Sequence, residues 1–303
     1  MPDISRILCP VDFSDSSTHA VDQAIAVAGW YKARIVALHV LEPLARPVQD
    51  LPVAAVTPSE TDRQRARDQT AACFGAATAA GIGVDVTVEV GTPAAAIAAC
   101  AVDRQADLIV MGTHGAGGFE RLLLGSVTEE VLRKAPCAIM SVPPRAQATS
   151  RLPFRQLLCA VDFSDCSLKA LDLALSLARE SGAALTLLHV LEWPWHEPPP
   201  PAFEELPRAQ AAALIEYRRH IETTAMGRLA ALVPAGERGQ GAVTPRVRHG
   251  KPYAEALREA AVDGADLIVV GVHGRNALDL LVFGSTTNHI VRQATCPVLT
   301  VRQ

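Results

Sequence analysis

The chain lacks the features that would place it in a membrane, on nucleic acid or outside the cell. Its 303 residues contain no apolar run of about 18, the length that a membrane-spanning helix needs. They contain no Lys/Arg cluster, and the net charge is −4, so a basic surface for nucleic acid is not expected. The N-terminus has no basic segment followed by an apolar one, so no signal peptide is expected.

Cysteine is also scarce, with seven residues and no Cys-x-x-Cys pair. An odd number at scattered positions favours reduced, mostly buried thiols over a disulfide framework or a zinc site. With the missing signal peptide, this predicts a cytoplasmic protein. Hydrophobic residues make up 49% and charged residues 20% of the chain, as is typical of folded soluble proteins.

The chain is internally duplicated. Three segments of the first half return in the second half in the same order, and a repeat this long indicates tandem domains rather than a solenoid. The matched segments are Leu8–Asp15 with Leu158–Asp165, Leu38–Glu42 with Leu188–Glu192, and Ala106–Val110 with Ala265–Val269. We therefore predict a first domain over residues 1–144 and a second over 152–303, joined by a polar, proline-led linker.

Within each copy, short apolar runs alternate with Ala-rich helical patterns, which predicts an α/β fold with a parallel sheet covered by helices on both faces. The runs in the first copy predict strands over 6–11, 34–41, 84–90, 107–112 and 137–142. Helices are predicted over 17–30, 59–80, 93–104 and 126–134, and a longer helix over 209–233 in the second copy.

Ligands of open parallel sheets bind at the carboxyl ends of the strands, near a switch in strand order. Asp12 and its counterpart Asp162 follow the first strand of each copy. One interpretation is that each carboxylate accepts hydrogen bonds from a ribose or an adenine amino group. The other is that it only closes the turn before the next helix.

A glycine pattern follows the fourth strand of each copy. The pattern reads Gly-x2-Gly-x9-Gly-Ser, with Gly112, Gly115, Gly125 and Ser126 in the first copy and Gly271, Gly274, Gly284 and Ser285 in the second. Gly-Ser opens a helix, whose unpaired N–H groups and dipole favour a phosphate. The alternative is a capping box from Ser126 to Glu129, but the second copy has Asn288 at the position of Glu129. The pattern is neither a Walker A loop nor the dinucleotide fingerprint.

Two histidines recur in each copy. His39 and His189 lie inside apolar strand patterns and are predicted to be hydrogen-bonded core residues. His114 and His273 lie in the glycine loops and are candidates for contacting a phosphate. The sequence shows no nucleophile elbow, HExxH motif or telling carboxylate pair, so no catalytic residue and no metal ligand is predicted.

Together, the Val-Asp-Phe-Ser motif, the Leu-His-Val strand end and the glycine pattern resemble the universal stress protein (UspA-like) family, twice over. The resemblance implies two tandem Rossmann-like domains, each a five-stranded parallel sheet of order 3-2-1-4-5, and ATP as ligand. It also implies that the last strands, 138–142 and 297–301, pair the two copies as an intramolecular pseudo-dimer. The nucleotide-binding residues implied for the first copy are Pro10, Val11, Asp12, Val40, Met111, Gly112, His114, Gly115, Gly125, Ser126 and Val127. Those implied for the second copy are Val161, Asp162, Val190, Val270, Gly271, His273, Gly274, Gly284, Ser285 and Thr286.

Three functions stay open at this point. The first is an ATP-binding switch or sensor of the stress response, requiring Mg²⁺, using one or both sites and read by a protein partner. The second is a slow ATPase or phosphotransferase, and the third is a scaffold that binds no nucleotide. Neither nucleic acid nor a membrane is an expected partner, and a homodimer beyond the internal pair is left open. The aromatic and Pro-rich stretch 193–201 is either a stiff surface loop or a partner-docking loop.

Overall fold

The computed structural model describes residues 4–46, 54–114, 124–144, 152–192, 208–237, 243–272 and 284–302. In the first repeat the chain forms β1 (Arg6–Pro10), α1 (Asp15–Tyr31), β2 (Arg34–Leu41), β3 (Leu44–Arg46), β4 (Ala54–Val56), α2 (Glu60–Cys73), α3 (Gly75–Ala79), β5 (Val84–Val90), α4 (Pro93–Asp103), β6 (Leu108–Gly112), α5 (Ser126–Lys134) and β7 (Ala138–Val142). In the second repeat it forms β8 (Gln156–Ala160), α6 (Asp165–Ser181), β9 (Ala184–Leu191), α7 (Arg208–Ala231), a short 3₁₀ turn (Ala235–Glu237), β10 (Val243–His249), α8 (Pro252–Asp263), β11 (Leu267–Gly271), α9 (Ser285–Gln293) and β12 (Val298–Val301).

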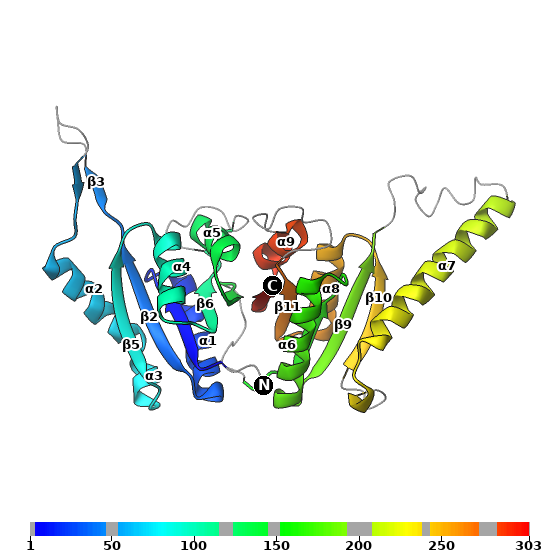
Figure 1. Ribbon diagram of the computed structural model, residues 1–303, viewed down its shortest axis with the longest axis horizontal. Coiled ribbons are helices and arrows are strands. Elements are labelled where there is room, and N and C mark those ends of the chain that lie inside the picture. Colours follow the sequence, from blue (N-terminus) through cyan, green and yellow to red (C-terminus); the bar gives the residue numbers. More distant parts are fainter. Residues whose placement is uncertain are drawn as a thin grey trace.

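The two repeats share one sheet. Its strand order is β10-β9-β8-β11-β12-β7-β6-β1-β2-β5, so each repeat contributes five parallel strands in the order 3-2-1-4-5. The junction is antiparallel, with Leu299 of β12 opposite Met140 of β7. The expected pairing of the last strands is therefore confirmed. It joins the two predicted five-stranded sheets into one, and Figure 1 shows the two repeats on either side of this junction.

Successive side chains of each strand point to opposite faces of the sheet, and both faces are buried. In β1, Ile7 and Cys9 pack on the side of α1, whereas Leu8 packs on the side of α4 and α5. The α1-side cluster runs without interruption into the second repeat, where it includes residues of α6 and α7. Both faces of the strands are covered, which is why the strands read as nearly continuous apolar runs.

The helices α1 and α6 begin at serine caps. The Ser14 side chain accepts a hydrogen bond from the Ser17 backbone N–H at 3.2 Å, and Ser164 does the same for Ser167 at 3.3 Å. Such caps satisfy N–H groups that the first turn of a helix leaves unpaired. They fix the start of α1 and α6 directly after the turn that follows β1 and β8.

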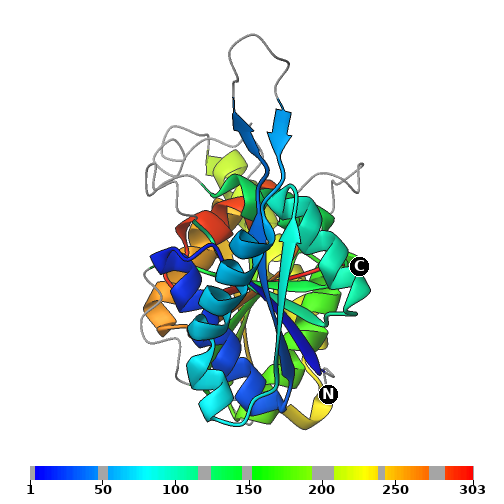
Figure 2. The same cartoon turned by 90° about the vertical axis from the view of Figure 1, so that its left-hand side faces the viewer.

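Most predicted boundaries hold, and two features differ. The predicted strands over 34–41 and 84–90 and the helix over 126–134 are confirmed as β2, β5 and α5. The helix predicted over 59–80 is divided into α2 and α3 at Phe74, whose side chain is fully buried in the core. The sequence analysis also missed the hairpin β3–β4, which extends beyond the sheet from the end of β2 (Figure 2).

The thiols are mostly buried, as predicted. All seven cysteines are free, five of them are buried, and Cys73 is the exposed one. Burial raises the pKa of Cys9 and Cys159, which lie within the central strands, far above the ordinary thiol value. These two side chains therefore act as small apolar core residues. Within the described ranges, no helix combines the length and apolar character that crossing a membrane requires. The segment 193–201 lies outside these ranges.

Candidate functional site

The candidate residues of each repeat gather at the carboxyl ends of three adjacent strands. β1 is paired with β2 on one side and with β6 on the other. The chain leaves β1 towards β2 and later returns to the opposite side of β1 as β6, so the strand order reverses between β1 and β6. This is where open α/β sheets bind ligands. The second repeat has the same switch between β8 and β11.

Asp12 and Asp162 each close the turn that follows the first strand of their repeat. Oδ1 of Asp12 accepts hydrogen bonds from the backbone N–H of Ser14 at 3.1 Å and from its hydroxyl at 2.6 Å. Asp162 holds Ser164 in the same way, at 3.0 and 2.6 Å. The turn-closing interpretation is therefore confirmed in both copies. The nucleotide-binding interpretation stays a prediction, because the carboxylate still lies at the strand end, exposed in the case of Asp12.

The recurring strand histidines are hydrogen-bonded core residues, as predicted. Nδ1 of His39 lies 2.8 Å from the carbonyl oxygen of Val11, and Nδ1 of His189 lies 2.7 Å from that of Val161. A carbonyl oxygen only accepts, so Nδ1 carries the proton in each ring. The bond ties the end of the second strand to the residue before the turn aspartate, which fixes that side of the candidate site.

Gly112 and Gly271 are required by a close approach of the neighbouring helix. A Cβ on Gly112 would lie 2.5 Å from Ser16 Oγ and 3.0 Å from the Ser16 carbonyl oxygen. A Cβ on Gly271 would lie 2.9 Å from both the Cys166 carbonyl carbon and the Ser167 nitrogen. The start of α1 or α6 therefore packs directly on the end of β6 or β11. This packing explains the first glycine of the pattern without a ligand.

The helices α5 and α9 begin without a side-chain cap. Their N-cap residues are Gly125 and Gly284, and no side-chain capping bond is formed at either. The capping-box interpretation is wrong, because Ser126 is the first residue inside α5 and not its N-cap. Ser126 and Ser285 are both exposed at these helix starts. The first-turn N–H groups and the positive end of the helix dipole thus face the strand ends with no side chain of their own satisfying them.

Backbone and threonine contacts lock each of these helix starts onto the sheet. Gly125 N–H donates to the Thr113 carbonyl at 2.9 Å, and Thr128 Oγ1 donates to the Gly112 carbonyl at 2.9 Å. In the second repeat, Thr287 donates to Gly271 at 2.8 Å. These threonines were not predicted from the sequence, although each one follows the last glycine of its pattern, Gly125 or Gly284, by three residues.

The other predicted residues that the structure describes lie at these strand ends and helix starts. Val11, Val161, Met111 and Val270 are buried at the ends of their strands, and Val40 and Val190 are half-buried on the adjacent strand. Pro10, with Ala160 as its counterpart, ends the first strand, and Val127 and Thr286 are half-buried in the first turns of α5 and α9. Gly115, His273 and Gly274 lie outside the described residues.

Comparison with known proteins agrees with this architecture. The model of the universal stress protein family matches residues 4–143 and again 153–302. A universal stress protein of Mycolicibacterium smegmatis is 30% identical over 306 residues, covering 98% of this chain and 96% of the relative. The chain belongs to the universal stress protein family. As a tandem member it also matches shorter relatives: Bacillus subtilis YxiE is 34% identical over 159 residues, 49% of this chain and 99% of YxiE.

Solved structures show that the universal stress protein fold extends over the whole chain. The crystal structure of a universal stress protein from Archaeoglobus fulgidus covers 100% of this chain and 97% of its own, with a TM-score of 0.69 at 21% identity. At this level of identity the likeness concerns the fold alone. The arrangement of two universal stress protein repeats in one chain is thus shared.

The two universal stress protein repeats differ around the turn aspartates. Phe13 and Phe163 adopt positive φ angles of 62° and 64°, and their rings lie tilted against His39 and His189 at centroid distances of 4.4 and 4.7 Å. Only in the second repeat does α7 supply Arg228, whose guanidinium carbon lies 4.0 Å from the centre of the Phe163 ring. The second turn is therefore covered by a cation–π contact, while the described part of the first repeat shows none over Phe13.

His114 stands at the end of the described part of the first glycine loop. Its backbone N–H donates to Ser16 Oγ at 3.4 Å, and its Nδ1 lies 2.9 Å from Thr113 Oγ1. Burial lowers the pKa of His114 below its ordinary value of 6.5, so the ring is neutral at pH 7. Nε2 is buried and has no hydrogen-bond partner among the described residues. His114 thus offers a hydrogen-bonding nitrogen, not a positive charge, to this site.

Proposed function

We propose that this tandem universal stress protein binds ATP, with Mg²⁺, at the starts of α5 and α9, and that occupancy of these sites acts as a switch read by a protein partner. The observation that carries the proposal is the uncapped start of both helices at the strand-order switch. A helix start of this kind is a ready anion site, since its N–H groups and dipole both favour negative charge. In each repeat it is bonded to the end of β6 or β11, the strand that pairs with the one before the aspartate turn.

The residues present fit a nucleotide in three parts. The first-turn amides of α5 and the exposed Ser126 hydroxyl supply donors for phosphate oxygens. The Asp12 carboxylate supplies an acceptor for ribose hydroxyls, while its Oδ1 keeps the turn closed through Ser14. Val40 and Met111, which belong to the same apolar cluster, would supply apolar surface for the base. The glycine pattern includes no Lys or Arg at a defined position, so a divalent cation would offset part of the phosphate charge.

The switch part of the proposal concerns the segment between strand and helix. Nucleotide phosphates at the start of α5 would hold residues 113–124 in one arrangement, and a partner would recognise that surface. Residues 115–123 lie outside the described part of the chain. Figure 1 shows α5 and α9 both at the upper edge of the molecule near its centre, so the two sites would present one composite surface.

The test uses a substitution that separates folding from binding. Calorimetric titration of nucleotide-stripped protein with ATP and Mg²⁺ should give two sites per chain. Ser126→Asp places a carboxylate in the first turn of α5, which stabilises the helix but repels phosphate. We expect Ser126→Asp to weaken ATP binding at the first site at least tenfold without lowering the melting temperature, and Ser285→Asp to do so at the second.

Ser126→Ala is the matched control, because Ser126 caps no helix and its removal should leave the melting temperature unchanged. An unchanged ATP affinity in the Ser126→Asp/Ser285→Asp double variant would contradict the site. Absence of ATP binding by the folded wild-type chain would instead favour the nucleotide-independent scaffold. Turnover of ATP that disappears in His114→Ala/His273→Ala would move the assignment to an ATPase.

A further inference from the structure

The two edges of the ten-stranded sheet are not equally protected. β5 is the last strand on the side of the first repeat, and among the described strands it pairs with β2 alone. β10 is the last strand on the side of the second repeat. Figure 2, seen from the side of the first repeat, shows β5 (cyan) in front of the other strands. An exposed edge is a template for another strand unless proline, charge or a covering element blocks it.

The backbone of β5 turns every second residue away from the sheet. The Ile35 N–H donates to the Gly83 carbonyl at 2.9 Å, and the Gly91 N–H donates to the Leu41 carbonyl at 3.0 Å. These two bonds and the regular register show that the residues of odd number in β5 bond to β2. The residues whose N–H and C=O groups point outward are therefore Val84, Val86, Val88 and Val90.

The other edge is blunted at the equivalent place. The Gly250 N–H donates to the Leu191 carbonyl at 3.1 Å, so the residues of odd number in β10 face outward. Pro245 is one of them, and it has no N–H to offer to a further strand. It occupies the position that Val86 has in the first repeat. Of the two edges, β5 therefore keeps every outward donor.

Arg34 reaches the β5 edge across a glycine. A Cβ on Gly83 would lie 3.6 Å from three atoms of the Arg34 side chain, which thus fills the space of a side chain at Gly83. Nη2 of Arg34 bonds to both carboxylate oxygens of Asp85, at 3.1 and 3.3 Å. Its Nε and Nη1 have no partner in the described part of the chain, and the side chain is 63% exposed. Two donor groups are therefore available beside Gly83.

Glu89 brings an unpaired carboxylate to the same face of β5. Asp85, Thr87 and Glu89 alternate with the valines, so their side chains share one face. Glu89 is exposed, and within the described ranges its side chain makes no ion pair or hydrogen bond. The edge thus carries one cation with spare donors and one carboxylate without a partner, at opposite ends of the strand.

The geometry points to a second copy of this chain as the partner of β5, paired antiparallel so that Val86 lies opposite Val86 of the second copy. Outward N–H and C=O groups of the two strands then face each other. Glu89 of the second copy comes to lie opposite Gly83, in a pair of the kind that brings side chains closest. Its carboxylate would accept from the spare donors of Arg34, and the two-fold symmetry makes this contact twice.

Charge selects this register over the next one. A shift that sets Thr87 opposite its own copy would also match the outward groups, but it would place Asp85 directly opposite Glu89. Like charges directly opposite each other destabilise a sheet. With Val86 at the centre, Asp85 lies opposite Thr87 instead, and each Glu89 faces an arginine.

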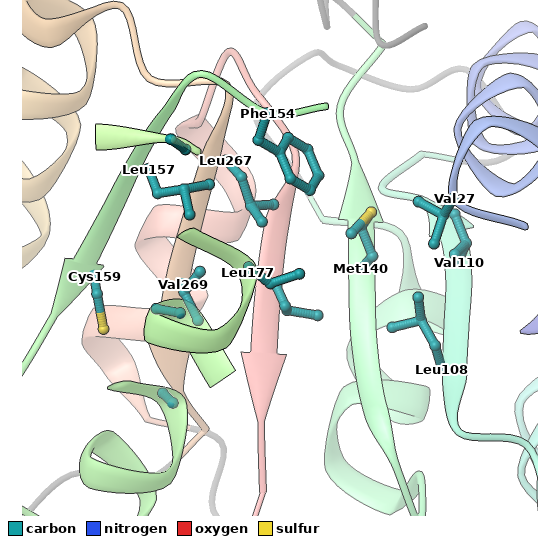
Figure 3. Packing of buried hydrophobic residues seen from close by; sticks show 14 of the residues in the cluster. Val27, Leu108, Val110, Met140, Phe154, Leu157, Cys159, Leu177, Leu267 and Val269 are labelled. Atoms are coloured by element: carbon teal, nitrogen blue, oxygen red, sulfur yellow. The ribbon is translucent and has the colours of Figure 1, made fainter. Parts of the chain in front are cut away.

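The chain already uses this arrangement once. At the junction of the repeats, β7 and β12 are equivalent strands paired antiparallel, with Met140 opposite its equivalent Leu299. Figure 3 shows the two repeats meeting there, with Met140 on one side and Leu177 on the other. Pairing through β5 would join two ten-stranded sheets as the junction joins two five-stranded ones. The inference does not depend on nucleotide binding.

The first test measures the mass of the full chain by sedimentation equilibrium, without nucleotide, over a range of protein and salt concentrations. We expect a reversible dimer that weakens as salt rises, because exposed ion pairs are screened. Val86→Pro removes the outward N–H at the centre of the pairing, and Pro245 shows that the fold accepts proline at this position. It should raise the dissociation constant at least tenfold. Val86→Thr, the matched control, keeps the N–H and should still dimerise.

The second test exchanges charges between two chains. Arg34→Glu alone would set carboxylates against each other across the pair, and Glu89→Arg alone would set guanidinium groups against each other, so each variant should be monomeric. Mixed in equal amounts, the two variants should form a heterodimer, because each contact again joins opposite charges. Native mass spectrometry detects it. A merely structural effect of either substitution would not be reversed by mixing.

Three outcomes would overturn the proposal. One is a wild-type chain that stays monomeric at its highest soluble concentration, which would leave the edge to solvent or to a strand of another protein. Another is a dimer that persists in folded Val86→Pro. The third is a failure of the two charge variants to associate on mixing while both are folded. If Val86→Pro does not fold, the charge exchange decides alone.

Discussion

The imidazole of His189 donates from Nδ1 to the carbonyl oxygen of Val161 at 2.7 Å, across two neighbouring strands. His189 is 5% exposed, and its counterpart His39 makes the same bond to Val11 from a half-buried position. In each repeat the bond holds the residue immediately before the turn aspartate. A histidine inside an apolar strand therefore shapes the candidate site through the residue that precedes the turn aspartate.

Removing this bond should cost more in the second repeat than in the first. His189→Ala leaves a buried carbonyl without its donor and a void in the core, so we expect a loss of about 2–3 kcal/mol in the free energy of unfolding. For the half-buried His39→Ala the loss should be about 1 kcal/mol. Urea denaturation measures both. His19→Ala, at a half-buried histidine whose Nδ1 lies 2.8 Å from the Asp15 carbonyl oxygen of the same helix, should change stability by less than about 0.5 kcal/mol. Equal values for all three variants would show that burial does not set the strength of the bond.

The close approach at the first glycine of the pattern predicts a loss of stability in both repeats. In Gly271→Ala the new Cβ would lie 2.9 Å from backbone atoms of Cys166 and Ser167, and in Gly112→Ala it would lie 2.5 Å from the Ser16 hydroxyl oxygen and 3.0 Å from the Ser16 carbonyl oxygen. Since a helix backbone cannot easily move, we expect a loss of about 2–3 kcal/mol in the free energy of unfolding for each variant.

Two variants check this explanation by thermal or urea unfolding. Ser16→Ala should recover part of the stability lost in Gly112→Ala, because it removes the atom nearest to the new Cβ. Gly227→Ala, in α7 with open space around its Cα, should stabilise the chain by about 0.5–1 kcal/mol. If Gly271→Ala were as stable as the wild-type chain, the packing of α6 on β11 would not be the reason for the glycine.

The second repeat holds an ion-pair network that has no counterpart in the described part of the first, and it makes the stability of the second repeat depend on pH. Glu259 is 2% exposed and binds Arg246 at 2.9 Å and Arg248 at 2.9 Å, and Arg246 also binds Asp263 at 2.8 Å. The first repeat has Cys100 at the position of Glu259. Burial pushes the pKa of Glu259 and Asp263 upward, but hydrogen bonds from Arg248 and Arg246 to Glu259, and from Thr186 and Arg246 to Asp263, hold each pKa below its ordinary value.

The direction of the pH effect follows from these lowered values. The carboxylates stabilise the folded state above their ordinary pKa values of 4.5 and 3.8, and this stability is lost as the pH falls through the lower folded values. Glu259→Gln should cost about 2–3 kcal/mol at pH 7, since both arginines keep some contact with water. The difference from wild type should shrink below about pH 4. Urea midpoints from pH 7 to pH 3 measure it. Asp85→Asn, which breaks the exposed pair with Arg34, is the control and should change little at any pH.

The sequence by itself determined the repeats, the strand and helix order and the elements that carry the candidate residues. Duplication, short apolar runs and helical spacing are all visible in the order of the residues, so the limits of β2, β5 and α5 could be predicted from the sequence alone. The division of one helix at Phe74 could not, because burial of that side chain depends on what packs over it. The hairpin β3–β4 was missed in the same way, since pairing across a long loop leaves only a weak local signal.

The tertiary structure decided what each candidate residue does. Ser126 reads as a helix cap in the sequence, and only the backbone shows that the N-cap is Gly125 and that Ser126 is the first residue of the helix. Gly112 reads as an anion-binding glycine, and only the packing of α1 shows that Ser16 already occupies the space of its Cβ. Local spacing fixes the elements, whereas contacts between distant segments fix which groups are left unsatisfied and therefore able to bind.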